Sequence, residues 1–89
     1  MASIAAAPST QKEQYLKNKQ ANADARKRKA MLERLKKECT TLEEELASIE
    51  EELFGSAASD YVRAAELDTR RAEVEERLLE IYGELENEE

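Results

Sequence analysis

The chain has 89 residues, of which 39% are charged, and it contains no Trp or His, one Phe, one Pro, one Cys and two Gly. A chain this short forms one domain at most and can bury only a small core, and its Glu, Lys, Arg, Leu and Ala content is typical of long helices or a coiled coil. No stretch approaches the roughly 18 apolar residues of a membrane span, and the lone Cys39 can form neither an internal disulfide nor, without His, a plausible zinc site. We therefore expect a cytoplasmic protein without cofactor or metal.

The first predicted element is a long helix. Residues 1–9 (MASIAAAPS) lack the features of a signal peptide and are expected to be a flexible tail or linker. Thr10 and Glu13 form a T-x-x-E capping box, so the helix is predicted over about 10–54, where neither Gly nor Pro interrupts it. Its second half carries a heptad seam, in which apolar residues alternate in steps of three and four: Leu32 (position a), Leu35 (position d), Cys39, Leu42, Leu46, Ile49 and Leu53.

A loop is predicted over 55–59 and a second helix over about 60–87. Gly55 suits the left-handed residue that often follows a helix end, and Ser59 or Asp60 suits the next N-cap. Gly83 falls at an outward position, where it lowers helix propensity. The second helix has its own heptad seam, made by Ala64, Leu67, Arg71, Val74, Leu78, Ile81 and Leu85.

The two seams match if the chain folds back at the loop. The predicted layers pair Leu32 with Ile81, Leu35 with Leu78, Cys39 with Val74, Leu46 with Leu67, and Ile49 with Ala64. Position a faces position d in each layer, as antiparallel seams require, and a short loop favours antiparallel neighbours. Leu42 would face Arg71, whose head group is expected to reach Glu38 or Glu45. The predicted fold is all-α: a monomeric two-helix antiparallel coiled-coil hairpin with an N-terminal helical overhang.

The charge of the chain reverses along the first helix, and two explanations compete. Residues 1–37 hold ten Lys/Arg against three Asp/Glu, whereas residues 38–89 hold four against eighteen. The first explanation is pairing within the hairpin, with Arg26–Lys29 opposite Glu84–Glu89 and the acidic stretch 43–52 opposite Arg63, Arg70 and Arg71. Each exposed ion pair contributes only about 0–1 kcal/mol, but together they specify orientation.

The second explanation is that the basic half serves an outside partner. Residues 10–24 would extend beyond the second helix, and Arg34, Lys36 and Lys37 lack opposing acids because Arg77 would face Lys36. Screening over roughly 8–10 Å lets a local basic surface attract phosphates despite a net charge of −7. Tyr15, on the same segment, could stack on a base or dock to another domain. The candidate residues for binding an RNA or DNA backbone are Lys12, Lys17, Lys19, Arg26, Lys27, Arg28, Lys29, Arg34, Lys36 and Lys37.

No catalytic residues are predicted. The glutamate runs 43–45 and 50–52 read as solvated helix faces, and Cys39 reads as a small core residue at a seam position. A two-helix rod offers no cleft that would adapt a carboxylate for acid–base catalysis. We therefore expect the isolated domain not to be an enzyme.

The order of features resembles the C-terminal domain found on many ABC-F ATPases. The resemblance covers about residues 11–87 and is carried by the basic lead YLKNKQ and ARKRK, the Glu-rich helix LEEELASIEEEL, the segment SDYVRAAEL at 59–67, and the ending IYGELEN, where Tyr82 could be the family's terminal aromatic. It implies an accessory domain that follows two ATP-binding cassettes in a longer parent chain and contacts nucleic acid or the ribosome. No G-x-x-x-x-G-K-[ST] loop occurs here, so the cassettes themselves are absent. The alternative is a protein-interaction or dimerisation coiled coil that binds no nucleic acid.

Overall fold

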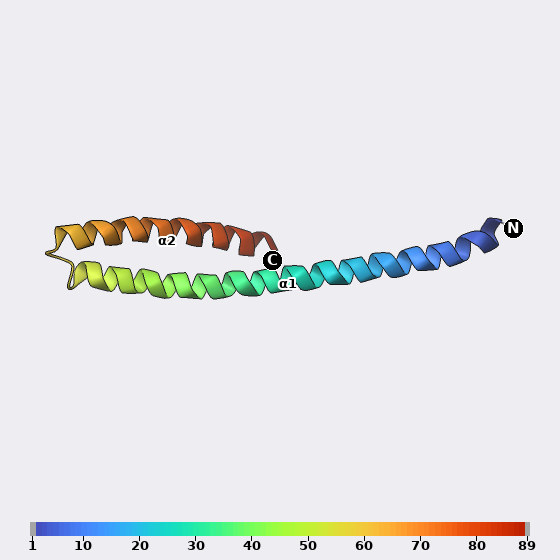
Figure 1. Cartoon of the computed structure of the whole chain (residues 1–89), viewed down its shortest axis with the longest axis horizontal. Coiled ribbons are helices and arrows are strands. Elements are labelled where there is room, and N and C mark those ends of the chain that lie inside the picture. Colours follow the sequence, from blue (N-terminus) through green and yellow to red (C-terminus); the bar gives the residue numbers. More distant parts are fainter. Residues whose placement is uncertain (1, 89) are drawn as a thin grey trace. The chain divides into compact units, whose positions relative to one another are not determined.

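The structure, a computed structural model, describes the backbone of residues 2–88 and the side chains of residues 10–88. It contains two helices, α1 (Ala2–Phe54) and α2 (Tyr61–Glu88), joined by a short loop (Figure 1). No strand occurs among the described residues. The prediction of an all-α helical hairpin is confirmed. Over the described residues, neither helix carries an apolar run that could cross a lipid bilayer.

The predicted start of the first helix at Thr10 is wrong, because α1 begins at Ala2. The residues assigned to a tail are rich in alanine, which has the highest helix propensity of all residues. Pro8 lacks a backbone N–H, but its fixed φ is compatible with a helix and it lies close to the N-terminal end, where few hydrogen bonds are lost. The alanine-rich sequence therefore continues the helix through Pro8, beyond the start that the capping box predicted.

The chain divides into two units, residues Met1–Leu32 and Glu33–Glu89, which are described separately. We call the described side chains of the first unit, residues 10–32, the N-terminal segment, and residues 33–88 the hairpin. The N-terminal segment is one uninterrupted stretch of α1, and its side chains are exposed except for the partly buried Ala23, Met31 and Leu32.

The core lies in the hairpin, along the predicted seam. Seven buried residues occupy a or d positions, three on α1 and four on α2: Leu35, Leu42, Ile49, Leu67, Val74, Leu78 and Ile81. Val74 and Ile81 are the most deeply buried of these. The remaining seam residues of the hairpin are partly buried: Cys39, Leu46, Leu53, Ala64, Arg71 and Leu85. The heptad phase predicted for both helices is therefore confirmed within the hairpin.

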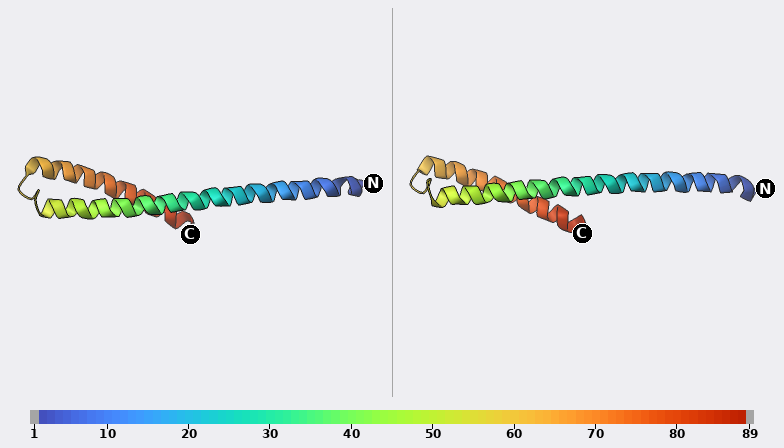
Figure 2. Two further views of the ribbon diagram at one scale, coloured as in Figure 1. Left: turned by 60° about the horizontal axis from the view of Figure 1, so that its bottom comes forward. Right: turned by 90° about the horizontal axis from the view of Figure 1, so that it is seen from below.

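Three ion pairs fix the antiparallel register of the hairpin. Arg63 Nε lies 2.6 Å from Glu52 Oε2. The same contact recurs in Arg70–Glu45 and again in Arg77–Glu38, and each pair lies seven residues further along α2 and seven residues back along α1. All six residues are at g positions, next to the seam, and the views of Figure 2 show α2 following the second half of α1. Because the three contacts recur at seven-residue intervals in opposite directions along the two helices, they show that α1 and α2 run antiparallel over this stretch.

Two details of the predicted charge pairing are wrong. Arg77 pairs with Glu38 and, within α2, with Glu80, instead of facing Lys36. Arg71 donates from Nη2 to Asp68 Oδ1 at 2.8 Å instead of reaching Glu38 or Glu45. An i, i+3 carboxylate on the same helix is available without crossing the seam, so Arg71 pairs locally.

The loop is held by its own backbone. The Ala57 amide donates to the Glu52 carbonyl at 2.8 Å, and Ala57 itself is only 2% exposed. Asp60 caps α2, since its Oδ1 accepts the Arg63 amide at 3.1 Å, which selects Asp60 over Ser59 as the N-cap. The left-handed conformation predicted for Gly55 is wrong, because no glycine has a positive φ. Gly55 is required for space: an added Cβ would lie 2.9 Å from the Glu51 carbonyl oxygen.

Candidate nucleic-acid interface

All ten predicted phosphate-binding residues lie on α1 and all are exposed. Seven belong to the N-terminal segment: Lys12, Lys17, Lys19, Arg26, Lys27, Arg28 and Lys29. The other three, Arg34, Lys36 and Lys37, belong to the first turns of the hairpin. A helix with exposed side chains can present long cationic groups to an extended polyanion without moving its backbone.

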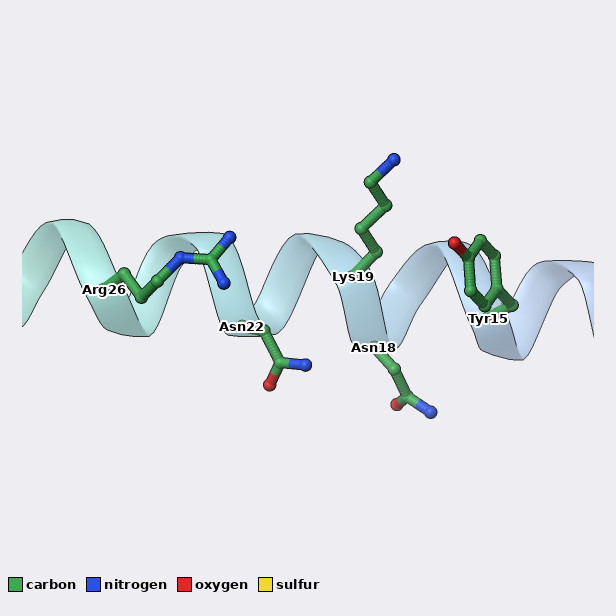
Figure 3. A pocket seen from close by; sticks show the side chains of 5 residues that line it. All are labelled: Tyr15, Asn18, Lys19, Asn22 and Arg26. Carbon is green, nitrogen blue, oxygen red and sulfur yellow. The ribbon is translucent and has the colours of Figure 1, made fainter.

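The N-terminal segment arranges part of its charge along one line. Lys12, Lys19 and Arg26 are seven residues apart, two helical turns, so they project from nearly the same side of α1. Figure 3 shows Lys19, Arg26 and Tyr15 together on the segment, with the side chains of Asn18 and Asn22 below them in that view. These five residues line a shallow open depression on the helix surface.

Tyr15 adds an aromatic ring to this surface. Its side chain is 64% exposed, and Leu16 beside it is 52% exposed. An exposed ring next to Lys19, one turn away, offers a flat face on which an unpaired base could stack. The structure thus places the predicted stacking residue among the predicted phosphate-binding residues.

The N-terminal segment contains few acids. Its seven cationic residues are accompanied in residues 10–32 by Glu13 and Asp24, and Asp24 accepts a hydrogen bond from Gln20 Nε2 at 3.0 Å. Leaving aside Arg28, none of the ten predicted residues forms an ion pair with a described residue. Their positive charge is therefore available to an external anion.

The arginines of α2 behave in the opposite way, because all four are paired with carboxylates: Arg63 with Glu52 and Glu66, Arg70 with Glu45 and Glu73, Arg71 with Asp68, and Arg77 with Glu38 and Glu80. The predicted pairing of the acidic stretch 43–52 with Arg63 and Arg70 is thus confirmed.

The paired groups show the expected electrostatic effects. Hydrogen bonds from Arg77, Arg70 and Arg63 lower the pKa of Glu38, Glu45 and Glu52 respectively. The same contacts raise the pKa of each arginine. These carboxylates therefore stay ionised at neutral pH and stabilise the hairpin.

Cys39 is part of a small cluster with Glu43 and Tyr82. Its Sγ donates to Glu43 Oε1 at 3.2 Å, and desolvation, followed by the neighbouring carboxylate, raises the pKa of the thiol. Partial burial and Glu43 likewise raise the pKa of Tyr82. A thiol with a raised pKa is a poor nucleophile. No group of three or more potential metal ligands occurs in the part of the chain that the structure describes.

Sequence reasoning missed a set of exposed apolar side chains on the hairpin. Phe54, Tyr61, Leu79 and Tyr82 are 81%, 94%, 70% and 43% exposed. They fall at b and e positions next to the seam, and these positions can be read from the heptad pattern. The exposed fractions in the structure show in addition that the partner helix does not cover these side chains.

Comparison of the chain with protein families, with curated proteins and with solved structures finds no match. The site therefore has to be interpreted from its own geometry and charge.

Proposed function

We propose that the N-terminal segment binds the phosphate backbone of RNA or DNA, and that the protein is a non-catalytic, monomeric, cytoplasmic accessory domain. The observation that carries the proposal is the contrast in pairing. Apart from Arg28, the predicted basic residues on α1 form no ion pair with a described residue, whereas every arginine on α2 does. The arginines that hold the hairpin together are thus paired with carboxylates, whereas the basic residues of α1 are exposed.

Geometry supports a backbone contact without sequence reading. From Lys12 to Lys29 the helix rises by about 26 Å, at about 1.5 Å per residue, which is long enough to follow several phosphates. The cations are flexible lysines and arginines on one helix surface with one aromatic ring, and contacts from such groups to phosphates carry no sequence information. Such a surface gives weak affinity that is largely independent of sequence.

The resemblance to ABC-F C-terminal domains is consistent with this activity and adds a context to the proposal. In that context the chain would follow two ATPase cassettes, and its basic helix would contact ribosomal RNA or DNA while the cassettes hydrolyse ATP. Sequencing the natural gene upstream of Met1 tests the context separately from the binding activity.

Salt dependence is the diagnostic measurement. Three to five phosphate contacts predict a slope of roughly −3 to −4 in a plot of log affinity against log salt concentration. With a net charge of −7 opposing association, the dissociation constant at low salt should be no tighter than about micromolar. Fluorescence anisotropy with a labelled ribosomal RNA fragment and a DNA duplex of mixed sequence measures both quantities.

A matched pair of variants locates the contact. Lys12→Gln, Lys17→Gln and Lys19→Gln together should lower the affinity at least tenfold and reduce the slope. Adding three acids to exposed positions of the hairpin, with Ala47→Glu, Ser48→Glu and Ala72→Glu, changes the net charge equally and should cost much less, because charges beyond about 10 Å are screened. Equal losses in the two variants, or no binding by the parent at low salt, would rule out the proposed interface.

A further inference from the structure

The two sides of the hairpin seam differ in chemistry. One side, which we call the arginine flank, carries the g positions and is sealed by the three pairs Arg63–Glu52, Arg70–Glu45 and Arg77–Glu38. The other side, which we call the open flank, carries the e positions and the adjoining b positions. Its charged and large apolar residues are Glu33, Lys36, Glu43, Glu50 and Phe54 on α1, and Tyr61, Asp68, Glu75, Leu79, Tyr82 and Glu86 on α2.

The large exposed apolar residues of the hairpin concentrate on the open flank. Of the five described, Phe54, Tyr61, Leu79 and Tyr82 lie there, and only Val62 lies elsewhere, at an f position. The end near Tyr82 is hollowed into an open groove of about 310 Å³, lined by Leu46, Glu75, Leu78, Leu79 and Tyr82. Apolar side chains gathered along one side of a two-helix rod mark a surface suited to a third helix.

Acidic residues occupy the stretch between the two apolar ends. Glu43, Glu50 and Glu75 form no ion pair with a described residue, and Asp68 pairs only with Arg71 of its own helix. Lys36 is the one cationic residue of this flank. The open flank therefore combines apolar ends with a negatively charged middle, whereas the arginine flank neutralises itself.

We propose that the open flank binds an amphipathic helix of another protein, with apolar residues at both ends and Lys or Arg between them. From Tyr61 to Tyr82 the hairpin rises by about 30 Å, the length of a helix of about 20 residues. Such a helix would cover the exposed apolar side chains and place its cations against Glu43, Glu50 and Glu75, completing a three-helix bundle. This interaction is independent of nucleic-acid binding by the N-terminal segment.

Two synthetic peptides test the chemistry of the partner. Both are 21-residue helical peptides with Leu and Phe on one face of each terminal turn. One has Lys and the other has Glu at the same middle positions. Isothermal titration calorimetry with the full chain at low salt should show saturable binding of the Lys peptide with one peptide per chain, and binding of the Glu peptide at least tenfold weaker.

Matched variants test the location. Leu79→Ser removes an apolar contact on the open flank and should weaken the Lys peptide about tenfold, whereas Val62→Ser, at an equally exposed position outside it, should change affinity less than twofold. Glu43→Lys with Glu75→Lys should weaken binding at least tenfold. Glu44→Lys with Glu76→Lys, one residue further along each helix, carries the same charge change and should have less than a threefold effect. Circular dichroism checks that the variants fold.

Several outcomes would overturn the proposal. These are no binding of the Lys peptide up to 500 µM (a limit of about 4.5 kcal/mol), equal affinity for the Glu peptide, or equal losses in the flank variants and their controls. Sedimentation velocity of the parent without peptide tests whether a second copy of the chain binds the open flank instead. If the parent self-associates and Leu79→Ser makes it monomeric, the open flank binds a second copy of the chain and the proposed partner is wrong.

Discussion

The N-terminal segment and the hairpin share one helix but owe their structure to different forces. In the hairpin, seam residues such as Val74 and Ile81 are 1% and 0% exposed, and ion pairs recur every two turns. In the N-terminal segment almost every side chain is exposed. The hairpin is stabilised by burial, whereas the segment depends on helix propensity and local contacts, which are marginal for an isolated helix.

The difference in charge follows the difference in packing. In the hairpin, the four arginines of α2 are drawn into pairs that specify register and the surplus is acidic, whereas Arg34, Lys36 and Lys37 of α1 form no ion pair with a described residue. In the exposed N-terminal segment, Arg28 aside, the cations form no ion pair with a described residue and can contact an external anion. The contrast suggests that the charge reversal along α1 has two causes, one in each region, and the following predictions test how separable the regions are.

The largest expected effect is loss of a buried seam residue. Ile81→Ala should lower the free energy of unfolding by about 2–5 kcal/mol, because Ile81 is fully buried and its truncation leaves a cavity. Leu16→Ala in the N-terminal segment should change it by less than about 0.5 kcal/mol. Urea unfolding followed by circular dichroism measures both. Similar losses would mean that the segment shares the stabilising core.

Removal of the α2 cap should be the next largest effect. Asp60→Ala should destabilise the hairpin by about 1 kcal/mol, because the Arg63 amide loses its acceptor. Ser59→Ala, one residue earlier, is the matched control and should leave the melting temperature nearly unchanged. A larger destabilisation by Ser59→Ala than by Asp60→Ala would assign the cap to Ser59.

Two glycine–alanine exchanges compare the regions directly. Gly83→Ala should stabilise the hairpin by about 0.5–1 kcal/mol, since an added Cβ meets no atom within 4 Å and alanine favours the helix. Ala21→Gly should reduce helicity near residue 21, seen as faster amide hydrogen exchange there, without lowering the hairpin's melting temperature. A lower melting temperature for Ala21→Gly would show that the two regions unfold together.

Acid should weaken the hairpin through the arginine flank, and this is the smallest effect. The pKa values of Glu38, Glu45 and Glu52 lie below the ordinary 4.5 in the folded state. Their stabilising contribution is therefore complete above that pH and is lost as pH falls through the lowered values. Melting temperature measured from pH 7 to pH 2 should fall in this window. In a variant with all three glutamates changed to Gln, the melting temperature should fall less between pH 5 and pH 2 than in the parent. An equal fall would show that other groups cause the acid effect.

Much of the fold was predictable because a heptad seam is a local pattern with a global consequence. Leu35, Leu42, Leu67, Val74 and Leu78 were assigned to the seam from spacing alone, and each is buried. Among the basic candidates, only Lys12, Lys19 and Arg26 have no acid at i±3 or i±4, so spacing along the helix did not by itself decide which cations form no ion pair.

The sequence by itself determined two helices, their seam and the reversal of charge, since all three depend on spacing along the chain. The tertiary structure decided which carboxylate each arginine takes, because Arg77 can reach Glu38 only when α2 lies against α1 in one register. It also decided that Gly55 serves close packing against Glu51, and that four of the five large apolar residues exposed on the hairpin lie on the open flank. These features depend on which atoms another element covers, and a pattern along one chain does not contain that information.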